Sequence, residues 1–410
     1  MLIRDLRTED GDGTTTFWAT IDWEDRQTPP YEAYFALRES DRWRVSLNAD
    51  AFRIPAAIVA RRHGLERITG GGPMCPVLHD GLANSLAWLT RWNGPSTVIP
   101  RLEFEKGCTH PSPTPPGAAA GFVSGGVDSS ALLVTNHLAH GTADPLRISV
   151  GIVVAGLQSH RWMDRQEIRD QLTAAQSDVA YIEAAMPIEI VPVATNIRGL
   201  DMDGRFWKYE YQGAALAGVA NLFATTISNV SIASSREIAH IDGFGSHPLL
   251  DTGYGSHSMR IWHTLAHMGR LEKTALVASQ PDLLKGLNVC NKAEAGDANC
   301  GRCDKCLRTK LALETMPDLR ATPVFATEGL RPSDLKLVRI GDPGHESYYA
   351  EMLEPLRSAG RSDLARSVEG VIRKGRLLRN QFVRPIRVWG SKVFPRQTRE
   401  RVLRIKKIPR

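Results

Sequence analysis

Residues 121–133, GFVSGGVDSSALL, decide how the middle of this 410-residue chain folds. An apolar run, residues 119–123, leads into the Ser-Gly-Gly turn of residues 124–126, and a helical pattern follows. Two glycines let the backbone turn tightly, so its N–H groups can face an anion without obstruction by a Cβ atom. The following helix start adds unpaired N–H donors and partial positive charge. The stretch predicts a strand, an anion-binding loop and a helix, with a plain turn capped by Asp128 or Ser129 as the alternative.

Short apolar runs alternate with helical patterns downstream of residue 118. The expected strands are residues 119–123, 147–155, 188–193 and 230–233, and the expected helices are residues 128–140, 164–185 and 208–224. This alternation predicts an α/β fold with a Rossmann-like, doubly wound parallel sheet. Residues 213–235 carry no charge, but their Asn, Thr, Ser and Ala content favours a buried helix and strand over a membrane span.

The chain divides into three regions by pattern. A proline-rich linker, residues 111–117 (PSPTPPG), separates residues 1–110 from the α/β region at residues 118–320. The first region is expected to be a small mixed α+β domain of unknown role; its expected elements are strands at residues 17–23 and 43–47 and a helix at 80–92. Residues 321–410 are expected to be a helical extension, with helices at 348–357 and 362–373 and a basic tail.

Charge is concentrated at the C-terminal end. Residues 371–410 hold fourteen Lys and Arg and one acid, Glu400, so the rest of this net +6 chain carries −7. The basic pI therefore gives no argument for nucleic-acid binding by the acidic body. A solvated cationic tail, contact with an anionic membrane and contact with nucleic acid all remain open. Six cysteines in a long chain and no apolar leader lead us to expect a cytoplasmic protein without disulfides.

The run SGGVDS, residues 124–129, resembles the signature of the PP-loop ATP pyrophosphatases. The Walker A and dinucleotide-binding glycine patterns are both absent. The resemblance implies ATP binding, attack of a substrate oxygen on the α-phosphate and release of pyrophosphate. It implies that the β- and γ-phosphates lie against Ser124, Gly125, Gly126, Val127 and Ser129. It also implies that backbone groups near Val154 to Gly156 hold the adenine.

Two charged residues complete the expected ATP site. Asp128 is a candidate Mg²⁺ ligand, since a carboxylate beside a polyphosphate commonly reaches the cation; helix capping alone is the alternative. Residues 269–274 begin a predicted helix, and several PP-loop families have a phosphate-binding lysine at such a helix start, which here is Lys273. A solvated surface lysine is its alternative, and Arg270 is a weaker candidate.

Four cysteines fall within 17 residues, at Cys290, Cys300, Cys303 and Cys306. They could supply the filled tetrahedral sulfur shell of a structural Zn²⁺ site. An iron–sulfur cluster and unmetallated thiols are the alternatives. Cys75 and Cys108 are expected to be structural or surface thiols.

The order of the two motifs resembles 7-cyano-7-deazaguanine synthases, which have a PP-loop early and four cysteines late. The SGYPDCR-like segment of that family is missing, because residues 234–251 read SSREIAHIDGFGSHPLLD. We therefore expect a substrate other than the deazaguanine precursor.

Residues 234–260, after the strand at 230–233, form the expected substrate loop, since ligands bind beyond the carboxyl ends of parallel strands. Five of the twelve histidines lie between residues 240 and 267. His247 and Asp251 are the first candidates, although a hydrogen-bonded loop role is the simpler interpretation of any one histidine. Trp207 and Tyr211 share a helix face, as core or as a pocket wall.

The sequence therefore predicts an AMP-forming ATP pyrophosphatase of the ligase type. ATP and Mg²⁺ would adenylate a carboxylate or carbonyl oxygen of a small molecule, and ammonia or an amine would form the amide- or nitrile-type product. The candidate catalytic residues are Asp128, Lys273, His247 and Asp251. The alternatives are a sulfurtransferase acting on tRNA or a small molecule, a non-catalytic ATP-binding regulator, and a zinc-dependent nucleic-acid-binding protein. A tRNA partner is not favoured, and a homo-oligomer is expected.

Overall fold

A computed structural model describes residues 1–24, 28–93, 98–107, 117–157, 163–241, 243–290, 299–320, 324–325 and 329–379. The chain forms two compact units. The first comprises Met1–Cys306 with the described residues of Ala321–Glu328, and the second comprises Leu307–Arg320 with the described residues after Gly329. No helix within these described ranges has the length and apolar character needed to cross a membrane.

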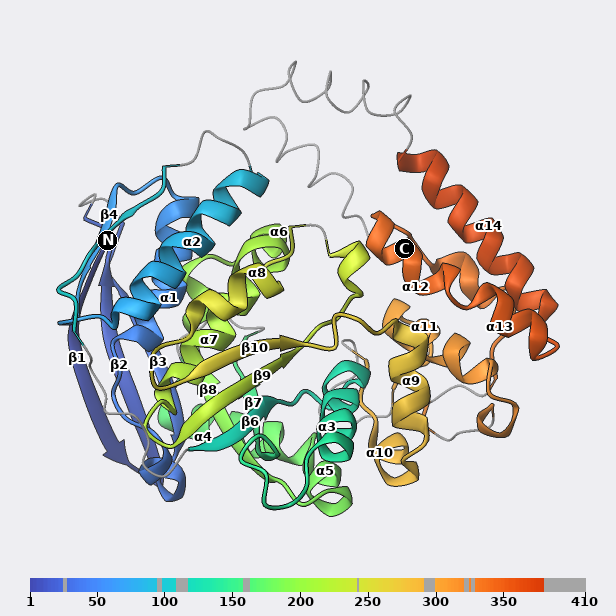
Figure 1. Ribbon diagram of the computed structural model, residues 1–410, viewed down its shortest axis with the longest axis horizontal. Helices are drawn as coiled ribbons and strands as arrows, with labels where there is room; N and C mark the ends of the chain where they lie inside the picture. Colours follow the sequence, from blue (N-terminus) through green and yellow to red (C-terminus); the bar gives the residue numbers. More distant parts are fainter. Residues whose placement is uncertain are drawn as a thin grey trace. The chain divides into compact units, whose positions relative to one another are not determined.

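Ten strands form one mixed sheet in the first unit, in the order β10-β9-β6-β7-β8-β3-β2-β1-β4-β5 (Figure 1). The strands are β1 (Leu2–Gly11), β2 (Thr14–Asp22), β3 (Tyr31–Arg38), β4 (Arg67–Gly70), β5 (Arg101–Glu103), β6 (Ala118–Phe122), β7 (Ile148–Ala155), β8 (Glu189–Thr195), β9 (Ile227–Ala233) and β10 (Arg260–Thr264).

The helices of the first unit follow the strands along the chain. They are α1 (Asp50–Arg62), α2 (Pro76–Asn93), α3 (Val127–Ala139), α4 (Arg165–Ser177), α5 (Ala180–Ala185), α6 (Gly204–Phe206), α7 (Gln212–Leu222), α8 (Pro248–Asp251), α9 (Arg270–Ala278) and α10 (Pro281–Gly286). A π-helix, Trp207–Tyr211, joins α6 to α7. The helix α3 lies over Gly121 of β6, and α4 packs against Trp18 and Tyr34, while α1 and α7 pack in the core cluster of the sheet.

The five strands from the expected α/β region run parallel, as β10-β9-β6-β7-β8. The uncharged residues 213–235 form most of α7 and the buried strand β9, as the sequence predicts. The sequence does not predict β10, because its five residues, RIWHT, include three polar side chains and form no apolar run.

The complete sheet is mixed, so the expected parallel sheet accounts for only part of it. β3 pairs with β8 in the antiparallel sense, and the hairpins β1–β2 and β2–β3 extend the sheet further. The β3–β8 pairing covers the carboxyl end of the β8 edge, where backbone groups would otherwise be unpaired. The strands of residues 1–110 thus belong to the same sheet and the same compact unit as the α/β region. The expected linker lies largely outside the described residues.

Residues 43–47, expected as a strand, have no strand structure. A 3₁₀ helix, Glu39–Arg44, follows β3 directly, and the Trp43 side chain is exposed. The expected helix near residues 80–92 is confirmed as α2.

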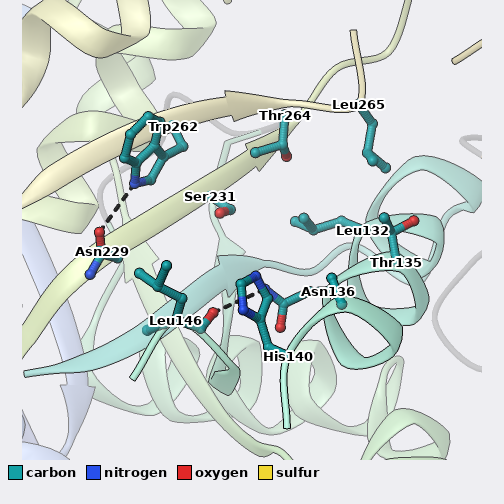
Figure 2. Close-up of a pocket in the computed structure, with 12 residues that line it drawn as sticks. Leu132, Thr135, Asn136, His140, Leu146, Asn229, Ser231, Trp262, Thr264 and Leu265 are labelled. Atoms are coloured by element: carbon teal, nitrogen blue, oxygen red, sulfur yellow. Dashed lines mark hydrogen bonds between the residues drawn. The ribbon is translucent and has the colours of Figure 1, made fainter. Parts of the chain in front are cut away.

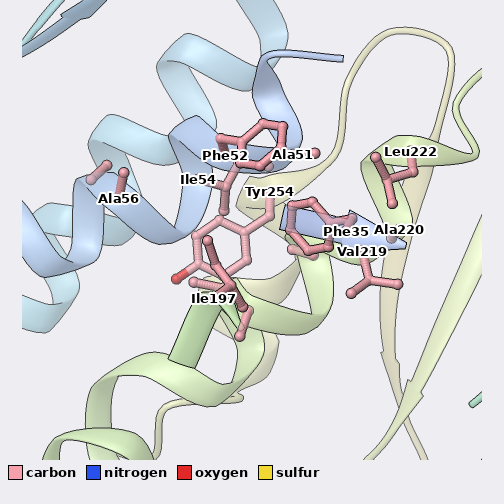
Figure 3. Close-up of a cluster of buried hydrophobic side chains, with 14 of the residues drawn as sticks. Phe35, Ala51, Phe52, Ile54, Ala56, Ile197, Val219, Ala220, Leu222 and Tyr254 are labelled. Carbon is pink, nitrogen blue, oxygen red and sulfur yellow. The ribbon is translucent and has the colours of Figure 1, made fainter. Parts of the chain in front are cut away.

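One large apolar cluster joins the N-terminal strands to the α/β region (Figure 3). Phe35 of β3 and Phe52 of α1 lie with ring centroids 5.0 Å apart, and the α7 residues Val219 and Leu222 are part of the same cluster. Phe35 and Leu222 are 187 residues apart in sequence, so the two parts of the first unit share this core.

The second unit is helical. It contains α12 (Pro343–Ala350), α13 (Leu353–Ser358) and α14 (Ser362–Arg379), and most of α11 (Asp304–Glu314). The carboxylate of Glu346 on α12 forms ion pairs with Arg376 and Arg379 on α14. The expected helix at residues 362–373 is confirmed as part of α14. The tail beyond Arg379, with its expected membrane or nucleic-acid contacts, lies outside the described residues.

Candidate functional site

The glycine loop between β6 and α3 has an open backbone. Gly125 has a φ of +70°, a left-handed conformation that glycine adopts without strain. No side chain in the described ranges caps the start of α3. Four consecutive backbone N–H groups meet no acceptor among the described residues, those of Gly125, Gly126, Val127 and Asp128. Such orphan donors at the positive end of a helix form an anion-binding cradle.

Two serine hydroxyls shape the loop from within. Ser129 Oγ accepts the N–H of Ser124 at 3.2 Å and donates to the carbonyl of Gly126 at 3.1 Å. The Ser124 hydroxyl, on an exposed residue, lies 3.3 Å from Ser129 Oγ. Ser129 therefore stabilises the turn, and Ser124 faces outward.

Two hydrogen bonds hold the carbonyl of Gly125 on the side away from solvent. It accepts the hydroxyl of Tyr181 at 3.0 Å and the backbone N–H of Asn288 at 2.8 Å. Burial raises the pKa of Tyr181 to about 12, so its hydroxyl remains a donor at neutral pH. Neither residue carries a signal that identifies this role in the sequence.

Two buried cations stand in the first turn of α9 and meet the carboxylate of Asp128. Arg270 Nη1 donates to Asp128 Oδ2 at 2.7 Å, and Lys273 Nζ lies 3.8 Å from Asp128 Oδ1. Lys273 also donates to the carbonyl of Ser234 at 2.6 Å. The start of a helix disfavours cations. Two buried cations there therefore mark a place where negative charge is held.

These groups gather where the chain changes direction across the sheet. β6 and β9 are neighbours, but the chain runs from β6 to β7 on one side and from β9 to β10 on the other. In open α/β sheets ligands bind outside the carboxyl ends of strands at such a switch point. Lys273 bridges the two strand ends, since Ser234 follows β9 and Asp128 follows β6. The neighbouring β7 ends at Ala155, directly after Val154, and Gly156 then follows with a φ of +86°.

His247, a candidate catalytic residue, caps a helix turn. Its Nδ1 accepts the N–H of Leu249 at 3.0 Å, and its ring packs edge-on against Trp92 with centroids 4.9 Å apart. Burial, together with the nearby His263, lowers the pKa of His247. A neutral imidazole in a capping role accounts for these contacts.

Asp251, the second candidate, forms a buried pair with His263 of β10. The Nδ1 of His263 lies 2.7 Å from Asp251 Oδ2, which also accepts the hydroxyl of Ser246 at 2.7 Å. Asp251 Oδ1 and His263 Nε2 have no hydrogen-bond partner among the described residues. The sequence pointed to Asp251 but not to His263, because β10 was not expected.

Trp207 and Tyr211 have different surroundings. They belong to the π-helix, with ring centroids 5.9 Å apart. Tyr211 is fully buried and stacks on Phe206, whereas Trp207 is half-buried beneath the guanidinium of Arg198, 4.5 Å from its ring centroid. Tyr211 is therefore a core residue, and Trp207 alone remains open to a ligand.

The four clustered cysteines come together as a candidate metal site. Their Sγ atoms all lie within 4.8 Å of one another, with neighbouring pairs at 3.4 to 3.9 Å. A tetrahedron with ~2.3 Å zinc–sulfur bonds has sulfur atoms about 3.8 Å apart. Burial raises the pKa of the Cys303 and Cys306 thiols. The set can hold a metal ion.

An apolar cavity of about 250 Å³ lies elsewhere, between α3 and the strands β9 and β10 (Figure 2). Its walls include Leu132, Thr135 and Trp262, whose indole N–H donates to Asn229 Oδ1 at 3.1 Å. The α3 residues that line the cavity lie from Leu132 onward, whereas the phosphate loop precedes the first turn of α3. This cavity therefore contains none of the expected site residues.

Comparison of this chain with protein-family models, curated proteins and solved structures finds no match. Of the remaining cysteines, Cys75 is buried, with Sγ accepting the N–H of His257 at 3.4 Å, and Cys108 lies outside the described residues.

Proposed function

We propose that this protein is an ATP-dependent, AMP-forming enzyme of the PP-loop pyrophosphatase type. The observation that carries the proposal is the convergence of the orphan N–H groups of residues 125–128 with Arg270 and Lys273 at one switch point. A strongly anionic ligand would meet the orphan backbone donors and lie beside the two cations that pair with Asp128. The SGGVDS resemblance makes that ligand the polyphosphate of ATP.

The strand order supports the finer fold assignment. If the five parallel strands are numbered 1 to 5 along the chain, their order in the sheet is 3-2-1-4-5. This order is found in doubly wound sheets. We therefore infer that the parallel half is Rossmann-like, with the antiparallel strands added at its β8 edge.

In the proposed reaction a substrate carboxylate oxygen attacks the α-phosphorus of ATP. The bond between that phosphorus and the bridging oxygen breaks, and pyrophosphate leaves with the electron pair. The loop N–H groups and Lys273 would stabilise the charge on the leaving pyrophosphate. Mg²⁺, when bound, neutralises polyphosphate charge. Asp128 would be its ligand, because Asp128 Oδ1 has no hydrogen-bond partner among the described residues. Ammonia or an amine would then displace AMP from the adenylated small molecule.

The cysteine geometry favours a single Zn²⁺ over an iron–sulfur cluster, because several irons between the thiolates would hold the sulfur atoms further apart. It also disfavours the sulfurtransferase alternative, since four of the cysteines are grouped as ligands and Cys75 is buried. A non-catalytic ATP-binding regulator is the second candidate, because the loop N–H groups and the two cations would support ATP binding with or without turnover.

The test is AMP and pyrophosphate release from ATP and Mg²⁺ with pooled carboxylates, nucleobases and tRNA. Lys273→Met is expected to lower kcat/KM roughly 10²- to 10³-fold, as for loss of one transition-state charge donor. Lys285→Met is the matched control, because Lys285 is exposed on α10 and pairs only locally with Asp282. ADP and phosphate as products would refute the proposal, and ATP binding without turnover in any pool would favour the regulator.

A further inference from the structure

A hydrogen bond connects the segment just before the candidate metal site to the phosphate loop. Asn288, whose backbone N–H donates to the Gly125 carbonyl at 2.8 Å, lies two residues before the ligand Cys290. Cys290, the first of the four cysteines, is thus two residues away from the backbone N–H that holds the Gly125 carbonyl.

The side chain of Asn299 clamps this segment to the other three ligands. Its Oδ1 accepts the N–H groups of Val289 at 2.8 Å and Cys290 at 3.0 Å. Its Nδ2 donates to the carbonyls of Leu287 at 2.7 Å and Val324 at 2.8 Å. These four bonds use the full capacity of a buried amide. Asn299 directly precedes Cys300, so the clamp and the metal ligands form one body.

The direction in which the loop N–H groups point depends on the contact between Asn288 and the Gly125 carbonyl. A peptide unit is planar, so its C=O and the N–H of the next residue point in opposite directions. Holding the carbonyl of Gly125 on the inner side therefore aims the N–H of Gly126 outward, at the anion. A glycine at positive φ has many alternative conformations, so this peptide needs an external restraint.

We propose that metal bound by the four cysteines fixes the phosphate loop in its anion-binding conformation, and that Asn299 is the positioning residue that transmits this restraint through residues 287–290. The inference rests on the proposed function, because it takes the loop as the site of the ATP phosphates. Linkage makes the coupling reciprocal: the factor by which metal tightens nucleotide binding is the factor by which nucleotide tightens metal binding.

Two pairs of variants in the full-length, zinc-loaded protein test the restraint. Asn288→Pro removes the N–H that donates to Gly125, whereas Asn288→Ala keeps it; Leu287 has φ −56° and ψ 121°, which a following proline accepts. Asn299→Ala removes the clamp, and Asn48→Ala removes an equally buried asparagine that bonds backbone groups elsewhere. Neither pair removes a cysteine ligand.

The readouts are affinity for a non-hydrolysable ATP analogue, bound zinc, and hydrogen exchange at the Asn288 amide. We expect Asn288→Pro and Asn299→Ala to bind the analogue roughly 3- to 10-fold more weakly, the effect of losing one hydrogen bond, while both alanine controls match the wild type. Zinc removal by a chelator is expected to give the same loss and to expose the Asn288 amide, and zinc reloading to reverse both.

Equal affinity for Asn288→Pro and Asn288→Ala, or an Asn288 amide equally protected with and without zinc, would overturn the coupling. If chelation unfolds the protein, the zinc-loaded variants still decide the question. Failure of the wild type to bind nucleotide would refute the proposed function, whereas the exchange measurement would still report on the restraint.

Discussion

At the scale of single residues, the site depends on backbone conformations that only particular residues adopt. Gly125 is the clearest case, because its φ of +70° is a left-handed conformation that favours glycine. A Cβ there would lie 3.4 Å from the Cβ of Asn288 and 3.5 Å from the hydroxyl of Tyr181.

Gly125→Ala is therefore expected to destabilise the protein by ~1–2 kcal/mol, the penalty for alanine in a left-handed conformation, and to weaken nucleotide binding. Gly13→Ala is the matched control: Gly13 has a φ of +75° in the β1–β2 turn, with no atom near its added Cβ. Chemical unfolding and ATP-analogue titration of both variants check the prediction. A loss of nucleotide affinity of the same size in Gly13→Ala would contradict a local effect.

His247 gives the stability of the first unit a pH dependence of known sign. Burial lowers its pKa from 6.5, and its Nδ1 caps Leu249 only while that nitrogen is unprotonated. Its stabilising contribution is thus complete above pH 6.5 and is lost as the pH falls below 6.5, through its lower folded-state pKa. We expect the free energy of unfolding to fall over that range less steeply in His247→Asn, whose amide oxygen can still cap. An unchanged slope in the variant would show that other groups set the dependence.

At the scale of elements, the sequence could predict those parts whose signal is local. The strand–loop–helix of residues 118–139, the start of α9 after Gly269, and the spacing of the cysteine cluster all follow from neighbouring residues. β10 could not be predicted, because five residues with Arg260, His263 and Thr264 among them show no apolar run. Because the sequence does not predict β10, it also gives no sign that His263 pairs with Asp251.

α1 was also missed, because Pro55 lies inside it and proline usually ends a helix. Tertiary packing outweighs this signal: nearly every residue of α1 is buried, against α7 among others. Proline has no N–H to donate to the carbonyl of Ala51, and α7 approaches that carbonyl at Gly218, where a Cβ would lie only 2.5 Å from the Ala51 oxygen.

Gly218→Ala should therefore force α1 and α7 apart and destabilise the first unit by ~1–3 kcal/mol, as overpacking does in other cores. Gly204→Ala, at the start of the same helical run, has no atom within 4 Å of the added Cβ and should be neutral or slightly stabilising. Thermal unfolding of the two variants gives the comparison. A neutral Gly218→Ala would mean that the helices have room to separate.

At the scale of the whole first unit, one junction decides whether the N-terminal strands are a domain or part of the sheet. β3 and β8 share two backbone positions, Phe35 opposite Thr195 and Ala36 opposite Ala194. Asn196 extends this short contact: its Oδ1 accepts the N–H of Tyr34, and its Nδ2 donates to the carbonyl of Glu32, both at 2.8 Å. No local pattern in the sequence could predict a pairing across about 160 residues.

Because the junction also closes the common core, β1–β3 and β6–β8 are expected to unfold together. Native-state hydrogen exchange should give their slowest amides the same free energy of opening. Asn196→Ala, which leaves the buried N–H of Tyr34 without its acceptor, should lower that free energy by ~1–3 kcal/mol in both groups of strands. If only the amides of β1–β3 opened more easily, the N-terminal strands would be an independent unit docked on the α/β sheet. A joint decrease would instead make the phosphate loop part of the same cooperative structure, since β6 carries the loop and its stability then depends on residues far from the site.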